Sequence, residues 1–181
     1  MEMNNNIDAI LISEEDIKNK VNELGKRINE DYKGKDLLLV GVLKGSMVFM
    51  SDLMRAINMN VKIDFMCVSS YGASTKSSGQ VRILMDLRSP IENIDVLIIE
   101  DILDSGVTLS YLTEVLNTRN PKSIEICTLL DKPSRRKANV NLKYRGFSIP
   151  DEFVVGYGLD YNEDYRNLPY IGVLKTEVYT I

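Results

Sequence analysis

The sequence predicts an α/β protein with a central, mainly parallel twisted sheet flanked by helices. Two uninterrupted apolar segments, residues 37–43 and 96–99, are typical of strands buried on both faces of such a sheet. Each is followed by a small glycine-containing turn and then by apolar residues at helical spacing. Because parallel strands end at one edge of a sheet, we expect both turns to face one crevice.

The other elements follow from local periodicity and from helix start and stop signals. Ser13, for example, precedes three acids and an apolar stripe, which is the pattern of an N-capped amphipathic helix. The expected helices cover residues 13–28, 47–57 and 108–116, and the expected strands cover residues 36–43, 61–68, 81–85, 96–99 and 124–130. Residues 69–80 are small, polar and rich in glycine, so we expect either a disordered hairpin tip or a lid.

Size and composition limit the possible functions. The chain has 181 residues, enough for one domain, with 44% hydrophobic and 27% charged residues and a net charge of −4. This charge gives no reason to expect nucleic acid as the main partner. The N-terminal apolar run is short, so we expect no signal peptide, no membrane span and a cytoplasmic location. No histidine occurs, so acid–base chemistry must come from carboxylates, lysine or tyrosine.

The segment VLIIEDILDSGVTLSYL, residues 96–112, holds most of the candidate chemistry. Glu100 and Asp101 stand where the strand is expected to end, and the turn 104–108 leads into a helix. Unpaired first-turn N–H groups and the helix dipole suit an anion there. Since the neighbouring acids would repel a phosphate, we expect a divalent cation and a ribose to complete the site. A plain N-cap without a ligand is the alternative.

Two further segments are expected at the same edge. Lys44 and Gly45 form a second strand-to-helix turn, which is either another anion cradle or an ordinary turn with a solvated lysine. Lys132 directly follows the strand 124–130, although the basic stretch 132–137 could be only a solvated turn. Residues 153–166 combine short apolar residues, aromatics and acids, which suits either a ligand-binding hood or a simple strand and turn.

The segment EDILDSGVT closely resembles the phosphoribosyl pyrophosphate signature of type I phosphoribosyltransferases. Together with SSYGASTKSSG and VVGYGLDYNEDYRNLP, it makes the chain similar to the bacterial hypoxanthine-guanine members of that family, with matches from about Leu37 to Leu174. The resemblance implies a single domain, 1–181. Its core would span about 35–135, its mobile lid about 69–81, and its hood the N-terminal segment and about 136–181.

The resemblance also implies an activity in purine salvage. The 5-phosphoribosyl group of phosphoribosyl pyrophosphate would pass to N9 of hypoxanthine or guanine, giving IMP or GMP and pyrophosphate, with Mg²⁺ as cofactor. A homodimer or homotetramer with an interface partly at residues 46–57 is implied, with no nucleic-acid or membrane partner. The alternatives are a xanthine-preferring enzyme and, less favoured for an acidic chain, an RNA-binding regulator of the same fold.

The family's roles at the phosphoribosyl pyrophosphate end fall on matching residues of this sequence. Asp104 is the implied catalytic acid–base group. The 5′-phosphate is assigned to Asp104, Ser105, Gly106, Val107 and Thr108. Pyrophosphate is assigned to Lys44, Gly45 and Arg166, with an implied cis peptide between Leu43 and Lys44. Glu100 and Asp101 are assigned to the ribose and, together with Asp160, to the metal.

The purine end and the lid are assigned in the same way. Ser70 and Tyr71 are the implied lid residues. The purine contacts are assigned to Lys132, Phe153, Val154 and Asp160. Lysine donates hydrogen bonds and accepts none, so Lys132 would favour a 6-oxo group over a 6-amino group.

Overall fold

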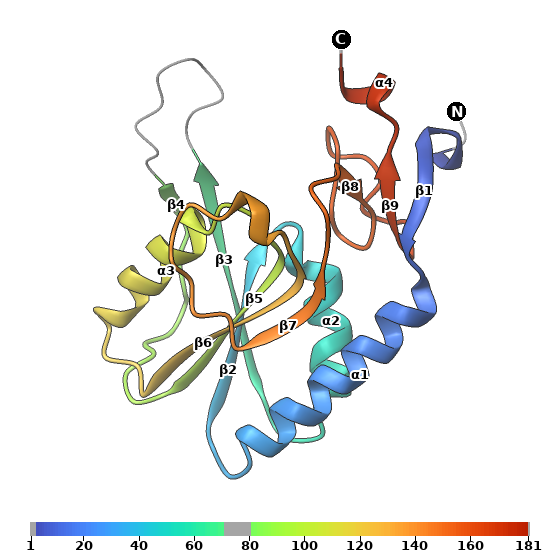
Figure 1. Cartoon of the computed structure of the whole chain (residues 1–181). Helices are drawn as coiled ribbons and strands as arrows, with labels where there is room; N and C mark the ends of the chain where they lie inside the picture. Colours follow the sequence, from blue (N-terminus) through green and yellow to red (C-terminus); the bar gives the residue numbers. More distant parts are fainter. Residues whose placement is uncertain (1–2, 71–80, 181) are drawn as a thin grey trace.

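A computed structural model describes residues 3–70 and 81–180 of the chain, and Figure 1 shows their arrangement. The predicted α/β architecture is confirmed. The helices are η1 (Met3–Asn6), α1 (Glu14–Asp31), α2 (Ser46–Ala56), α3 (Val107–Asn117), η2 (Pro133–Arg135) and α4 (Thr176–Tyr179). The strands are β1 (Ile7–Ile12), β2 (Leu37–Leu43), β3 (Lys62–Ser70), β4 (Val81–Met85), β5 (Asp95–Leu103), β6 (Ser123–Asp131), β7 (Tyr144–Ser148), β8 (Val154–Val155) and β9 (Ile171–Leu174).

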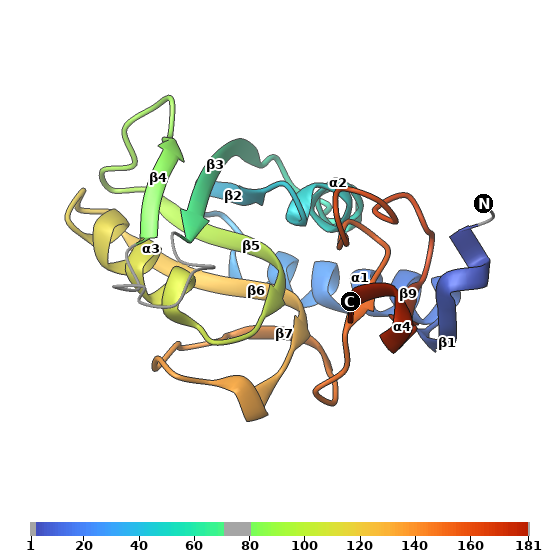
Figure 2. The same cartoon turned by 90° about the horizontal axis from the view of Figure 1, so that it is seen from above.

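The main sheet has six strands in the order β4-β3-β2-β5-β6-β7, and only β4 runs antiparallel to its neighbour. Alternate residues of a strand point to opposite faces, so β2 and β5 contribute to two separate cores. Leu39 and Leu97 pack with α1 and α2, whereas Val40 and Ile98 pack with α3. Figure 2 shows these helices on the two sides of the sheet. This burial explains why β2 and residues 96–99 of β5 carry no polar side chain.

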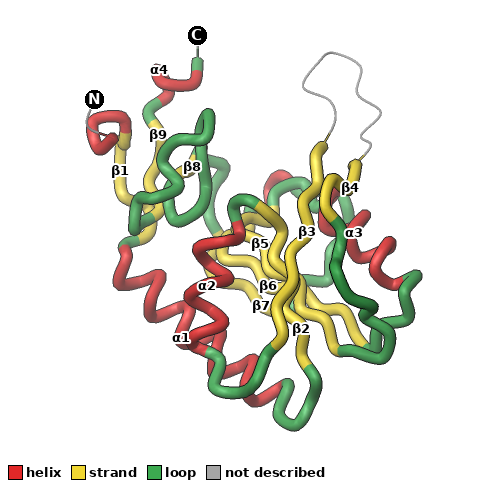
Figure 3. Tube along the Cα trace, turned by 180° about the vertical axis from the view of Figure 1, so that it is seen from behind, coloured by secondary structure: helices red, strands yellow, loops and turns green. Residues whose placement is uncertain are grey.

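A second sheet of three strands, in the order β1-β9-β8, lies beside the main one. These strands, the loop 156–170 and α4 form the hood, and Figures 1 and 3 show both chain ends there. β1 pairs antiparallel with β9, Ile7 facing Leu174, so the N-terminal strand lies in the same sheet as the C-terminal strands. The chain ends in the hood with the short strand β9 and the helix α4.

The boundary between core and hood lies later in the chain than the sequence suggested. β7 pairs in parallel with β6, Leu130 facing Phe147, and so belongs to the main sheet rather than to a hood starting at 136. α1 also packs against the main sheet through residues such as Leu24, which lies before the expected core start at 35. Among the described residues, none of the helices combines the length and apolar character needed to cross a membrane.

Candidate functional site

The acidic pair Glu100 and Asp101 lies within β5, not at its end as the sequence suggested. The pairing of β2 with β5 stops at Gly41 and Ile99, but the pairing of β5 with β6 continues to Leu103. β5 therefore extends beyond its neighbour β2 with only β6 as partner. The sequence could not reveal this extension, because it depends on the register of β6 and not on local polarity.

Burial makes it costly for both carboxyl groups of this pair to be negatively charged. Asp101 is 8% exposed, and its Oδ1 accepts a hydrogen bond of 2.8 Å from the N–H of Ile102. Burial raises the pKa of both carboxyl groups, and the Asp101 charge raises the pKa of Glu100 further. A cation or hydroxyl donors next to the pair would relieve this cost. Both groups are hard oxygen donors of the kind that Mg²⁺ prefers.

The turn after β5 has the geometry of an anion cradle. Gly106 caps α3 with a left-handed φ of 80°, and a Cβ atom there would lie 2.9 Å from Val140 and 3.1 Å from the carbonyl oxygen of Ala138. The carbonyl oxygen of Ser105 accepts hydrogen bonds from the N–H groups of Lys137 (2.8 Å) and Ala138 (3.1 Å). The turn is thereby fixed at the N-terminus of α3, where N–H groups and the helix dipole favour an anion.

The turn between β2 and α2 lies directly against the acids. The peptide between Leu43 and Lys44 is cis, as the resemblance implies. A Cβ atom on Gly45 would lie 1.7 Å from Oδ2 of Asp101, so only glycine fits at this position. On the other side, a Cβ atom on Gly158 of the hood would lie 2.1 Å from the carbonyl oxygen of Gly45. The acids, this turn and the hood loop are therefore stacked in contact.

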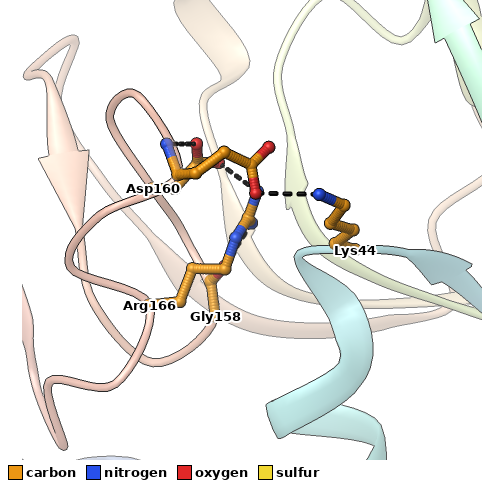
Figure 4. Close-up of polar contacts among 5 residues, drawn as sticks. Lys44, Gly158, Asp160 and Arg166 are labelled. Carbon is orange, nitrogen blue, oxygen red and sulfur yellow. Dashed lines mark hydrogen bonds and ion pairs between the residues drawn. The ribbon is translucent and has the colours of Figure 1, made fainter.

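Charged side chains of the hood loop and of Lys44 form a network above this turn (Figure 4). Arg166 contacts Asp160 (Nη2 to Oδ1, 2.8 Å) and donates a hydrogen bond to the carbonyl oxygen of Gly158 (2.8 Å). Lys44 contacts Glu163 (Nζ to Oε2, 2.8 Å), and that oxygen is 3.5 Å from Nη2 of Arg166. These five residues form the Lys44–Arg166 cluster.

Two features of this cluster were missed by the sequence analysis. Glu163 joins the two candidate pyrophosphate-binding cations, and only its place between Asp160 and Arg166 in the motif could have signalled it. Asp160, expected at a metal and at the purine, has both oxygens engaged, since its Oδ2 accepts a hydrogen bond of 3.0 Å from the N–H of Glu163. In this arrangement Asp160 orders the hood loop.

The candidate purine residues lie around Lys132. Its N–H donates to the carbonyl oxygen of Leu103 (3.0 Å), and its Nζ donates to the carbonyl oxygen of Glu152 (2.6 Å). Lys132 is 6% exposed, and burial lowers the pKa of its amine. Phe153 and the buried Val154 follow Glu152 directly, so Lys132 connects the end of the main sheet to the expected stacking aromatic.

Asp104 has a charged neighbour, Arg135. This arginine lies in the basic stretch 132–137, which by sequence could have been only a solvated turn. Arg135 lies 3.6 Å from Oδ2 of Asp104 (from Nη1) and 2.5 Å from Oδ1 of Asp151 (from Nε). Oδ1 of Asp104 is buried and has no hydrogen-bond partner among the described residues. One oxygen of Asp104 thus lies near a cation, while the other is an acceptor without a partner among the described residues. Arg136 is also ion-paired, with the buried Asp131.

A cavity of about 240 Å³ occupies this edge of the sheet. It is lined by Val42, Leu43, Val68, Glu100, Asp101, Ile102, Leu103, Asp104, Ser105, Gly106, Thr108 and Leu109. Candidate ribose and phosphate residues therefore share one cavity, whereas Lys132 and Phe153 are not among its described lining residues. Of the expected lid residues, Ser70 ends β3, and Tyr71 lies outside the described residues.

The two carboxylates Glu100 and Asp101 suit a metal ion that is also held by substrate oxygens. Within residues 3–70 and 81–180, no three of the Asp, Glu and Cys side chains are grouped closely enough to bind a metal ion. Mg²⁺ commonly binds through one or two carboxylates together with water and substrate phosphates. Glu100 and Asp101 match that pattern.

Comparison with known proteins agrees with this geometry. Residues 9–162 match the family model described as phosphoribosyl transferase domain. A hypoxanthine-guanine phosphoribosyltransferase of Staphylococcus aureus is 60% identical over 98% of this chain and 99% of its own length.

Solved structures give the same result. A crystal structure of a hypoxanthine phosphoribosyltransferase from Staphylococcus aureus has a TM-score of 0.96 at 58% identity and covers 100% of this chain and 98% of that one. A hypoxanthine phosphoribosyltransferase from Trypanosoma cruzi has a TM-score of 0.91 at 45% identity, covering 97% of this chain and 100% of that one. The paired strand–turn–helix units, their shared cavity and these likenesses show that the chain belongs to the phosphoribosyl transferase family.

Proposed function

We propose that this chain is a cytoplasmic purine salvage enzyme that transfers the 5-phosphoribosyl group of phosphoribosyl pyrophosphate to N9 of hypoxanthine or guanine. The products are IMP or GMP and pyrophosphate. The observation that carries the proposal is the stacking of three segments at one sheet edge, with Gly45 between Asp101 and Gly158. The name of the relative that is 60% identical, hypoxanthine-guanine phosphoribosyltransferase, supports the substrate class. The related Trypanosoma cruzi structure is described as a ternary substrates complex.

Charge placement accounts for the transfer step. As N9 of the purine attacks C1′ and the bond to pyrophosphate breaks, positive charge develops on the ribose and negative charge on the leaving group. The cationic groups of Lys44 and Arg166 and the backbone at Gly45 stabilise the leaving pyrophosphate. Glu100 and Asp101 orient the ribose hydroxyls, and the turn 104–108 holds the 5′-phosphate.

Asp104 is the group placed to take a proton from the base. A purine that carries its proton on N7 must lose it as N9 forms the new bond, so a carboxylate close to N7 assists the reaction. The Oδ1 atom of Asp104, which has no hydrogen-bond partner among the described residues, is such an acceptor, and Arg135 lies near Oδ2. The absence of histidine from the chain leaves this role to a carboxylate.

Mg²⁺ is proposed to bind at Glu100 and Asp101, where it would neutralise charge on pyrophosphate oxygens. The buried pair is suited to a cation because burial disfavours both negative charges. Asp160 contributes less directly, since both of its oxygens already have partners within the hood loop.

Recognition of the base is assigned to Lys132, Phe153 and Val154. The amine of Lys132 has two N–H donors besides the one directed to Glu152, so it can donate to a purine 6-oxo group. An adenine 6-amino group offers only donors there and is disfavoured. The ring of Phe153, 38% exposed, provides a stacking surface.

The direct test is an assay of pyrophosphate release with phosphoribosyl pyrophosphate, Mg²⁺ and hypoxanthine, guanine, xanthine or adenine in turn. We expect turnover with hypoxanthine and guanine and none with adenine. Asp104→Asn should lower kcat by about 10²- to 10⁴-fold while the protein remains folded. Lys132→Ala should chiefly raise the KM for the purine. Full activity of the first variant, or unchanged base selectivity in the second, would contradict these roles.

A homodimer or homotetramer with an interface partly on α2 is also part of the proposal. Met47 on α2 is 53% exposed, and a cavity of about 490 Å³ lies between α1, α2 and the hood loop. An exposed apolar side chain and a cavity on the same helix suit a contact with a second subunit. Light scattering after size-exclusion chromatography gives the subunit number, and a monomer at all concentrations would refute this part.

A further inference from the structure

Phe153 belongs to a group of three aromatic rings in the hood. Its ring centroid lies 4.7 Å from that of Tyr179, with an angle of 22° between the planes, so these two rings are stacked. The centroid of Tyr161 lies 5.7 Å away at 87°, in edge contact. One face of Phe153 is thus covered by Tyr179, and Tyr161 is in T-shaped contact with the same ring. Phe153 is nevertheless 38% exposed, so part of the side chain stays open to a ligand.

Tyr179 is held in place by the hood. It lies on α4, and it packs against the buried cluster formed by Val155, Tyr165, Leu168 and Leu174. The backbone directly before α4 is anchored as well. The N–H of Leu174 donates to the carbonyl oxygen of Phe153 (2.8 Å), and the N–H of Lys175 donates to that of Asn6 (3.0 Å). The stacked pair therefore joins the C-terminal segment to the start of β8 through both backbone and side chain.

We propose that Tyr179 is a positioning residue for purine recognition, holding the ring of Phe153 so that its exposed side receives the base. This inference rests on the proposed function and deepens it. A phenylalanine that contacts no other ring can tilt about its χ angles, whereas one held against two neighbouring rings presents a more fixed plane. Because the ring of Phe153 is already ordered before a base arrives, the side chain loses less conformational freedom when the base binds.

Steady-state kinetics separate this role from a structural one. Tyr179→Ala should raise the KM for hypoxanthine and guanine about two- to twelvefold, the range expected for one lost aromatic stack. The KM for phosphoribosyl pyrophosphate and kcat should change by less than about twofold, because neither depends on the plane of the ring. Tyr179→Phe retains the stacked ring and should restore wild-type values.

Val178→Ala is the matched control. Val178 lies next to Tyr179 on α4 and packs against the same hood cluster, but it has no place in the ring stack. If α4 matters only for stability, both alanine variants should change purine KM alike, and the inference is overturned. An unchanged purine KM in Tyr179→Ala also overturns it. A lower KM would show that Tyr179 obstructs the base, which is the opposite role.

A binding measurement gives an independent readout. The chain contains no tryptophan, so Tyr179→Trp introduces a single indole stacked on Phe153. If the base binds the other face of Phe153, GMP should leave acrylamide quenching of the indole unchanged or lower it. Displacement of the indole by GMP, seen as increased quenching, would overturn the inference. If GMP fails to bind the wild-type protein, the proposed function falls, and the inference with it.

Discussion

Gly45→Ala tests whether backbone packing at the sheet edge sets the geometry of the site. The backbone of Gly45 has φ −59° and ψ −36°, which alanine adopts without strain. The methyl group, however, would lie 1.7 Å from Oδ2 and 2.6 Å from Cγ of Asp101, and real Cβ atoms essentially never approach within 3.0 Å. The difference between 3.0 and 1.7 Å, about 1.3 Å, is the least that the carboxylate or the turn must move.

This displacement should damage activity more than stability. A misplacement of about 1 Å at a reacting centre can cost about 100-fold, so we expect kcat/KM for pyrophosphate release to fall about 100-fold, equivalent to about 2.7 kcal/mol. Overpacking of this kind costs about 1–3 kcal/mol of stability, which lowers Tm by several degrees without unfolding the protein. The assays are steady-state pyrophosphate release and thermal unfolding of the same preparation.

Gly34→Ala is the matched control. Gly34 has a left-handed φ of 73°, and nothing lies within 4 Å of a Cβ atom built there. Alanine should therefore cost about 1–2 kcal/mol of backbone strain and lower Tm by a few degrees, with kcat/KM unchanged. The reasoning is refuted if Gly45→Ala keeps wild-type kcat/KM, or if Gly34→Ala loses as much activity at an equal loss of Tm.

Three further changes test separate contacts. Glu163→Gln removes the carboxylate that contacts both cations of the Lys44–Arg166 cluster. Because these cations would then be free for pyrophosphate, we expect the KM for phosphoribosyl pyrophosphate to fall about two- to fivefold. A higher KM would show that Glu163 aids binding. The paired hydrogen bonds from Arg119 lower the pKa of Asp86, so the stability that Asp86→Asn removes should be present at pH 7 and vanish as the pH falls below about 4 in urea unfolding series. Tyr144→Phe removes the hydrogen bond donated to Asp31 (2.6 Å) and should lower the free energy of unfolding by about 1 kcal/mol with kcat/KM unchanged; lost activity would link this distant contact to the site.

The two central strands of the main sheet were the easiest to predict because they are buried on both faces. β2 and residues 96–99 of β5 are packed from both sides, so every position there is apolar or glycine and the pattern needs no knowledge of neighbours. The turn at Gly106 was predictable for a related reason, since glycine adopts a left-handed conformation without the steric cost that other residues meet. Burial and backbone conformation restrict the residue types at individual positions, so both can be predicted from local sequence.

Contacts between segments far apart in the sequence cannot be predicted from local sequence in this way. Lys44 and Glu163 are 119 positions apart, and the 31 positions from Asp104 to Arg135 include a complete helix and strand. The sequence around an exposed lysine or glutamate looks the same whether that side chain is ion-paired or only solvated. The extension of β5 past Glu100 was missed for the same reason, because only the register of β6 determines it.

The stacked glycines explain how a site of charged groups keeps its shape. Gly158 lies against the carbonyl oxygen of Gly45, and Gly45 lies against Asp101, so the layers from hood to sheet are spaced by backbone contact. Ion pairs between exposed side chains, such as that of Lys44, contribute little to such spacing because water screens them. Side chains of the Lys44–Arg166 cluster can therefore exchange partners when an anion binds, while the position of the acids relative to the turn stays fixed by packing that only glycine permits.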